Sequence, residues 1–202
     1  MQNSFSIEEA MKFGWRKTRE HSGLLFQGLL TLFAIQVAHS MVERVLEGTL
    51  LGSLATLALF IVSVFVGIGF TQIGLKIAKG QRADYSDIIP PFELVIRYVF
   101  AAVLVGLIVI AGLILFIIPG IYFALRFSMV RFSILEGADV IDSLGESSKL
   151  TKGVKWKLLG FFLVFGLLNI VGALLLLIGL IVTIPMTLIA YAHVYKHLSG
   201  AR

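Results

Sequence analysis

The chain has 202 residues, of which 58% are hydrophobic and only 14% are charged. Soluble domains carry about 25% charged and about 45–50% apolar residues, so a globule of this composition would lack polar side chains to cover its surface. The composition therefore excludes an ordinary soluble domain and predicts a protein that lies in a lipid bilayer.

The chain contains no cysteine, which excludes disulfides, thiolate metal sites and a cysteine nucleophile. Its formal net charge is +5. On a membrane protein such a charge is typical of basic segments near anionic lipid on the cytoplasmic side, so we expect no nucleic-acid partner. The first apolar run begins at Gly23, after a segment of mixed charge, which predicts a retained first span and no cleavable signal peptide.

Four long apolar stretches follow one another at about 23–42, 50–75, 92–135 and 157–198. One membrane-spanning helix needs roughly 20 residues, so the first two stretches predict single spans and the two longer ones predict helical hairpins. We therefore expect an all-α polytopic fold, with residues 1–202 forming one integral membrane domain. Its six spans, paired as three hairpins, are predicted at about 23–42, 50–75, 92–111, 113–135, 157–178 and 180–198.

A weak internal repeat superposes Gly106 on Gly172 and Pro119 on Pro185 at one common offset. Because Gly179 is a natural turn between the last two spans, the repeat predicts the preceding hairpin turn near 111–112.

On this interpretation Pro119 and Gly120 form a kink within the fourth span, and a neighbouring helix satisfies the freed carbonyl group. The alternative places the hairpin turn at Pro119 and Gly120 themselves. That choice would leave a short fourth span, with Arg126 deep in the bilayer.

Each hairpin is preceded by a polar segment, at 6–22, 82–97 and 138–157. In the first segment Ser6 and Glu9 form a capping-box pattern. The first and third segments place acidic residues early and basic residues late, which suits the helix dipole. In the middle segment Pro90 and Pro91 are expected to end a short helix before the third span.

We expect these segments to form a cytoplasmic collar of amphipathic helices. The alternative is that they are ordinary connections that shield the base of the bundle. Indole rings prefer the headgroup layer, and basic side chains attract anionic lipid. The residues predicted to contact lipid headgroups are Trp15, Arg16, Lys152, Lys155, Trp156 and Lys157.

Every Lys and Arg except Arg44 lies in the N-terminal segment, around 76–97 and 126–157, or at the C-terminus. With six spans all of these regions fall on one face of the membrane. The positive-inside rule then predicts a multi-pass membrane protein with both termini in the cytoplasm.

A few polar residues lie within the predicted spans. Arg126 is about 10 residues from the cytoplasmic end of its span, so we expect it to face protein or trapped water. Its expected partners are polar groups of a neighbouring span, or acidic residues of the polar segments such as Glu93 or Asp87. Arg131 lies nearer to the surface. The candidate intramembrane polar site, a small cavity for a headgroup or solute, consists of Gln36, His39, Asn169 and Arg126. The alternative is interhelical hydrogen bonding, at ~0.6 kcal/mol per bond.

Catalytic patterns are absent from the sequence. It contains no GxSxG, HExxH or P-loop motif, and its carboxylates cluster in the polar segments. His193 and His197 have the spacing of a metal-binding pair, but no acidic third ligand lies near in the sequence. We therefore expect no catalytic residues, no metal and no cofactor.

Three segments carry a family resemblance: "IIPGIYFALRFSMVRFSILEG" at 117–137, "DVIDSLGESSKLTKGVKWKLLGFF" at 139–162 and "TIPMTLIAYAHVYKHL" at 183–198. The chain resembles the membrane domain attached to some bacterial glycerophosphoryl diester phosphodiesterases, and its stand-alone six-helix relatives of unknown function. The resemblance is best over 112–198. It implies the fold class and an inner-membrane location, but not the diesterase activity, which belongs to a separate soluble barrel in the fused proteins.

The sequence therefore predicts a non-enzymatic inner-membrane protein with a structural or accessory role tied to lipids or the envelope. We expect anionic membrane lipids as partners, with a homo-oligomer or a protein partner also open. One alternative is a small transporter or permease subunit, which a polar cavity reaching the midplane would favour. The other is a membrane-embedded hydrolase, which paired acidic residues in a cleft would favour.

Overall fold

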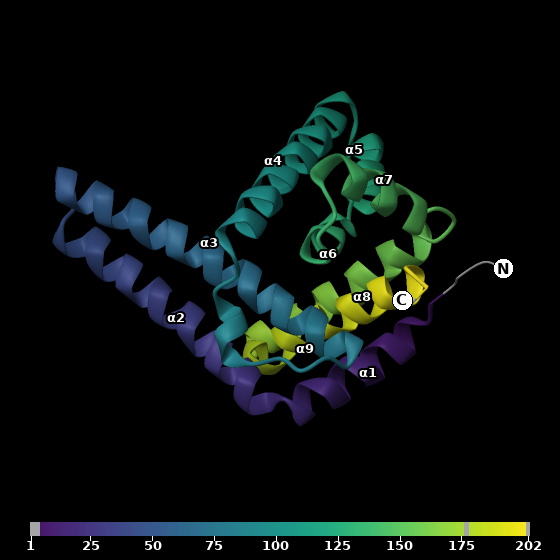
Figure 1. Ribbon diagram of the computed structural model, residues 1–202, viewed down its shortest axis with the longest axis horizontal. Coiled ribbons are helices and arrows are strands. Elements are labelled where there is room, and N and C mark those ends of the chain that lie inside the picture. Colours follow the sequence, from purple (N-terminus) through teal and green to yellow (C-terminus); the bar gives the residue numbers. More distant parts are fainter. Residues whose placement is uncertain (1–4, 176–177, 201–202) are drawn as a thin grey trace.

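The computed structural model describes residues 5–175 and 178–200, and over these residues the protein is all-α (Figure 1). Six segments are long and apolar enough to cross a membrane, which confirms the predicted fold class and makes the chain an integral multi-pass membrane protein. These segments are Ser22–Val45, Leu50–Lys79, Phe92–Leu115, Ile117–Leu135, Lys155–Leu174 and Gly179–Leu198.

The elements follow the chain in the order α1 Ile7–Glu20, α2 Ser22–Val45, α3 Leu50–Lys79, η1 Tyr85–Ile88, α4 Phe92–Leu115, α5 Ile117–Arg126, α6 Val130–Leu135, α7 Val140–Leu150, α8 Lys155–Leu174 and α9 Ile178–Leu198. Several ends have local causes. Ser6 accepts a hydrogen bond from the N–H of Glu9 (3.3 Å), which confirms the predicted N-cap of α1. Gly80, with φ of 74°, ends α3 in the left-handed conformation.

The three hairpins meet at one end and separate at the other (Figure 1). The α2–α3 and α4–α5 hairpins project away from the centre in different directions, while α8 and α9 run side by side beneath them. The described ends of the chain lie near each other. We call the meeting region, formed by the C-terminal ends of α3 and α9, the start of α8, and α6–α7, the basic end.

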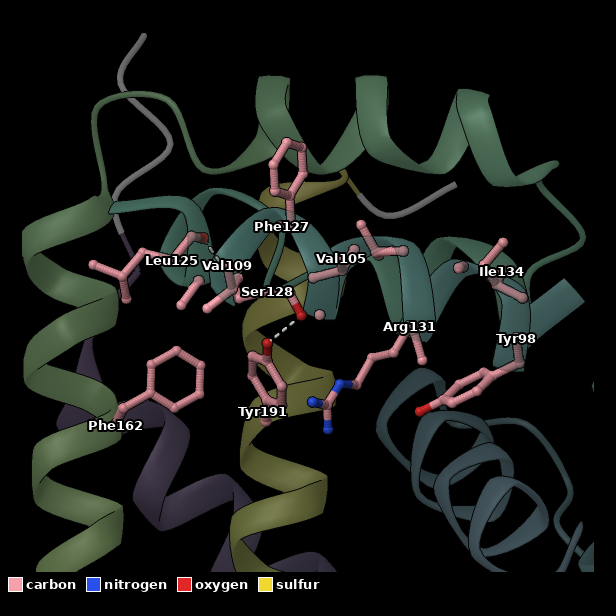
Figure 2. A pocket seen from close by; sticks show the side chains of 15 residues that line it. Tyr98, Val105, Val109, Leu125, Phe127, Ser128, Arg131, Ile134, Phe162 and Tyr191 are labelled. Atoms are coloured by element: carbon pink, nitrogen blue, oxygen red, sulfur yellow. Dashed lines mark hydrogen bonds between the residues drawn. The ribbon is translucent and has the colours of Figure 1, made fainter. Parts of the chain in front are cut away.

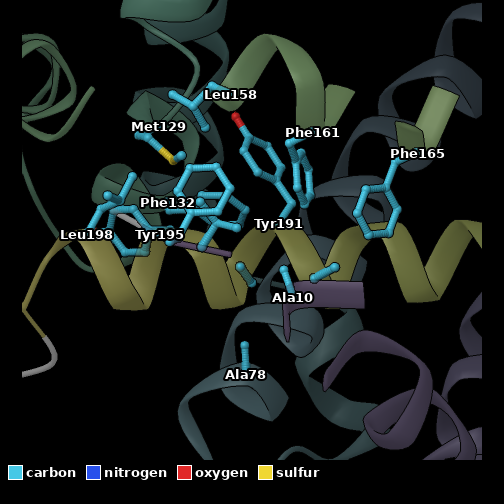
Figure 3. Packing of buried hydrophobic residues seen from close by; sticks show 14 of the residues in the cluster. Ala10, Ala78, Met129, Phe132, Leu158, Phe161, Phe165, Tyr191, Tyr195 and Leu198 are labelled. Carbon is cyan, nitrogen blue, oxygen red and sulfur yellow. The ribbon is translucent and has the colours of Figure 1, made fainter. Parts of the chain in front are cut away.

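The main apolar core lies at the basic end around α9. Figure 3 shows aromatic rings from α6, α8 and α9 gathered there. The ring centroids of Phe132 and Tyr191 are 4.9 Å apart, and those of Phe161 and Phe165 are 4.4 Å apart. Phe132 and Phe161 are fully buried, so this cluster fixes α6, α8 and α9 relative to one another.

Helix α1 packs along α9 with a face of small residues. Ala10, Gly14 and Thr18 are spaced four residues apart and are buried. A Cβ atom on Gly14 would lie 2.7 Å from the carbonyl oxygen of Met186, so glycine permits the close approach. The first polar segment is therefore an amphipathic helix as predicted, and its apolar face covers a membrane-spanning helix.

The predicted hairpin turn near 111–112 is wrong. Helix α4 continues to Leu115, and the chain turns at the extended residue Phe116. Gly112 is needed for helix contact, because a Cβ on it would lie 3.0 Å from the Cα of Gly120 in α5. Pro119 is the third residue of α5, where its missing N–H has no helical partner to lose. It therefore forms neither the predicted kink nor the alternative turn.

The middle polar segment forms the short helix η1, which ends before the two prolines as predicted. It is joined to α3 by an ion pair in which Lys76 Nζ donates to Asp87 Oδ1 (2.6 Å). Burial tends to raise the pKa of Asp87. The hydrogen bond from Lys76, the N–H of Asp84 and the Lys76 charge outweigh burial and hold the pKa below its ordinary value.

The lowered pKa of Asp87 predicts that the folded chain loses stability at acidic pH. Because the pKa of Asp87 is lower in the folded chain, its contribution is complete above the ordinary pKa and is lost as pH falls through the lowered value. We expect the melting temperature in detergent to fall as the pH drops below about 4. Asp87→Asn should weaken this dependence, and an unchanged pH profile in that variant would contradict the assignment.

Candidate functional site

The fourth span is broken between α5 and α6, and side chains from other helices satisfy the exposed backbone. Ser147 Oγ donates to the carbonyl oxygen of Arg126 (2.8 Å) and accepts from the N–H of Met129 (3.1 Å). Thr151 Oγ1 lies within hydrogen-bond range of two carbonyl oxygens, those of Ser147 (2.9 Å) and Arg126 (3.1 Å), and its one proton serves either of them. The hydroxyl of Tyr191 donates to the carbonyl oxygen of Ser128. An irregular segment can exist within a span when the protein provides such partners.

A groove with a cavity volume of ≈ 410 Å³ lies beside this break, between α4 and the α5–α6 segment (Figure 2). One wall is a single face of α4, whose contributing residues recur at helical spacing. The opposite wall comes from α5 and α6, and Phe162 of α8 and Tyr191 of α9 close the back. The α4 residues are Tyr98, Ala101, Ala102, Val105, Gly106 and Val109.

Small side chains in the α4 wall, at Ala101, Ala102 and Gly106, help to make the groove hollow. A Cβ placed on Gly106 would have no heavy atom within 4 Å, and Ala102 is exposed. The volume falls within the range of about 300–1,000 Å³ that small-molecule sites occupy. Most of the lining is apolar, so the groove suits a hydrocarbon group better than a polar solute.

Its polar end is formed by Arg131, Tyr191 and Tyr98. The Arg131 guanidinium lies 5.5 Å from the ring centroid of Tyr191, within cation–π range. Figure 2 shows the Arg131 side chain extending towards Tyr191, with Tyr98 on its other side. Among the described residues Arg131 forms no ion pair. Its guanidinium donors are therefore available to an anionic ligand.

Arg126 lies against α7 and does not line the groove. Its Nε donates to Ser148 Oγ of α7 (2.9 Å), and its guanidinium lies 5.5 Å from the ring of Phe127. Of the two kinds of partner that we expected, the acidic one is not found among the described residues, where Asp87 pairs with Lys76. The partner of Arg126 is a neutral hydroxyl, which α7 supplies in place of a neighbouring span. The expectation that Arg126 faces protein agrees with its partial burial.

The other residues of the predicted polar site lie on separate helices. His39 contacts Glu43 one turn along α2 (3.2 Å), and Gln36 is exposed on the same helix. Asn169 of α8 donates to Thr187 of α9 (3.0 Å). The outer half of α2 extends away from α5 and α8 (Figure 1), so the structure does not bring the four predicted residues together. The Asn169 bond matches the interhelical alternative.

The predicted lipid-contacting residues are mostly exposed. Trp15 is 52% exposed and Trp156 is 86% exposed, as expected for indoles that contact headgroups. Lys155 instead lies over the ring of Tyr122, with its Nζ 4.8 Å from the centroid. Arg16, Lys152 and Lys157 are exposed. Contact of these residues with lipid stays a prediction.

His193, one residue of the histidine pair, packs against another helix. The ring of His193 stacks on Phe13 of α1, with centroids 3.9 Å apart. Within the described part of the chain, no group of three or more His, Asp or Glu residues is arranged to hold a metal ion.

Comparisons with protein-family models, curated proteins and solved structures gave no match. Function is therefore inferred from the residues and geometry of the groove.

Proposed function

We propose that this protein is a non-enzymatic component of the bacterial inner membrane, with both termini in the cytoplasm and an accessory role tied to membrane lipids. The observation that carries this proposal is the groove between α4 and α5–α6. It combines a mostly apolar wall with Arg131 at its end, an arginine without an ion-pair partner in the part of the chain that the structure describes, and this is the polarity pattern of an amphiphile.

The groove lining supports binding over catalysis. Its residues include Ser128, two tyrosines and Arg131, but no Asp, Glu, His or Lys side chain that could act as a general base at neutral pH. A hydrolase would need a nucleophile with a base within hydrogen-bond reach. A transporter for a polar solute would need polar groups along the cavity, whereas the lining of this groove is mostly apolar and its polar end is formed by Arg131, Tyr98 and Tyr191.

The distribution of basic residues supports the orientation. Lys76, Lys79 and Lys196 end α3 and α9, and the third polar segment adds further lysines at the same end of the bundle. The resemblance to the membrane domain of glycerophosphoryl diester phosphodiesterases also favours an inner-membrane location. The positive-inside rule assigns this end to the cytoplasm.

Thiol labelling tests the orientation, because the chain has no competing cysteine. An impermeant reagent added outside intact spheroplasts should label Glu47→Cys, between α2 and α3, and should not label Gly145→Cys in α7. Both positions are exposed, so burial cannot account for a difference. The reverse pattern would contradict the proposed topology.

Native mass spectrometry of the protein released from nanodiscs tests the lipid role. With a mixture of zwitterionic and anionic phospholipids, we expect the retained lipid to be enriched in the anionic species, since charge-assisted contacts are stronger than neutral ones. Retention in the proportions of the bulk bilayer would argue against a lipid-specific role. Co-purification of a stoichiometric polar solute would favour the transporter instead.

A further inference from the structure

The helix that carries Arg131 is held in place by its neighbours. Phe132, Ser133 and Ile134 are completely buried, whereas Arg131 on the same short helix is exposed. Glu136, which follows α6, pairs with Lys79 at the end of α3. Packing and an ion pair therefore fix α6 at the basic end, and they direct its arginine into the groove.

The α4 wall of the groove has about the length of one membrane leaflet. From Tyr98 to Val109 it rises about 16 Å at 1.5 Å per residue. Half of a bilayer hydrocarbon core is about 15 Å thick. The wall leads from the basic end towards the tip of the α4–α5 hairpin, so a chain in it would extend from the headgroup level into the membrane core.

We propose that this groove holds one anionic phospholipid of the leaflet at the basic end, with its phosphate on the Arg131 guanidinium and one acyl chain along Ala102 and Gly106. The inference rests on the proposed lipid-related role and specifies its site. A guanidinium offers a planar fork of donors that fits phosphate oxygens, and the Tyr98 hydroxyl adds a further donor at the same end. A membrane phospholipid is the source, because the tail site is apolar.

Two substitutions separate the contributions of the headgroup and the tail. Arg131→Gln removes the cation but keeps a polar side chain. Gly106→Phe places a ring at the tail site, because Gly106 lines the groove. An added Cβ there meets no heavy atom within 4 Å, so the first atom of the new side chain fits without a clash. The control for charge is Arg82→Gln, because Arg82 is 88% exposed and pairs with Asp84 outside the groove.

The measurement is native mass spectrometry from nanodiscs that contain phosphatidylethanolamine and phosphatidylglycerol, with a melting curve for each variant. We expect the wild-type chain and Arg82→Gln to retain one phosphatidylglycerol. Arg131→Gln should retain about tenfold less phosphatidylglycerol, and Gly106→Phe should also lose this lipid. Both variants should keep the melting temperature of the wild-type chain. Added inorganic phosphate should not displace the lipid.

Several outcomes would overturn this assignment. Retention in both groove variants would place the lipid elsewhere. If retention instead falls only in Lys152→Gln with Lys157→Gln, the exposed basic residues bind the lipid, so the proposed function stands and this site is wrong. If phosphatidylethanolamine and phosphatidylglycerol are retained equally, Arg131 does not select an anionic headgroup. If the wild-type chain retains no anionic lipid, the proposed function fails as well.

Discussion

Replacing Gly69 by alanine is expected to destabilise the protein by about 2–3 kcal/mol, at the upper end of the usual cost of overpacking. Gly69 lies in α3 where η1 crosses it, and an added Cβ would lie 2.1 Å from the carbonyl oxygen of Ile88 and 2.3 Å from its carbonyl carbon. Both atoms belong to the backbone, so no side-chain rotation can relieve the contact. The η1 segment would have to move away from α3.

Gly67→Ala provides a matched control two residues earlier in the same helix. A Cβ on Gly67 would meet no heavy atom within 4 Å. Since alanine is the better helix former by about 1 kcal/mol, this variant should be neutral or slightly stabilising. At roughly 2–4 °C per kcal/mol for a chain of this size, the two variants should differ by several degrees in melting temperature in detergent. Equal melting temperatures would show that η1 does not pack on α3 as described.

The number and approximate limits of the spans could be predicted because they depend on local hydropathy. The hairpin turn could not be predicted, because it depends on contact between helices. Gly112 and Pro119 are both ordinary turn signals in a sequence. In the structure Gly112 serves the approach to Gly120, and Pro119 occupies a first helical turn where proline costs little. The internal repeat could not distinguish these uses, since it matches residue types and not their contacts.

The sequence analysis assigned the polar site to Arg126, whereas in the structure Arg131 lines the groove. The reason again lies in contacts between helices. A continuous fourth span would have extended one helical face from 113 to 135, and Arg126 would have been the deeper cation. The break at Phe127–Met129 resets the direction of the side chains that follow, so Arg131 enters the groove while Arg126 reaches α7. The small residues of α4 were the available signal, since Ala101, Ala102 and Gly106 fall on one helical face and reduce its bulk there.

The second large effect is expected at Ser147, whose hydroxyl hydrogen-bonds to backbone groups on both sides of the break between α5 and α6. Its side chain is completely buried, accepts from the Met129 N–H (3.1 Å) and donates to the Arg126 carbonyl oxygen (2.8 Å). Ser147→Ala leaves the N–H of Met129 without this acceptor in a buried position. The Arg126 carbonyl oxygen keeps Thr151 Oγ1 within hydrogen-bond range, at 3.1 Å. Stranding one buried donor costs about 1–3 kcal/mol, so we expect a loss of about 2 kcal/mol in the free energy of unfolding.

Ser148→Ala is the matched control at the next position of α7. Its hydroxyl accepts only from Arg126 Nε (2.9 Å) and is partly exposed, so water can replace it at a cost below about 1 kcal/mol. Hydrogen exchange gives a local readout: in Ser147→Ala the amide of Met129 should exchange faster than in wild type, and in Ser148→Ala it should not. Because α6 also carries Arg131, loosening the break should weaken retention of the anionic lipid in Ser147→Ala alone. If the two serine variants match in both stability and exchange, Ser147 does not hold the break together.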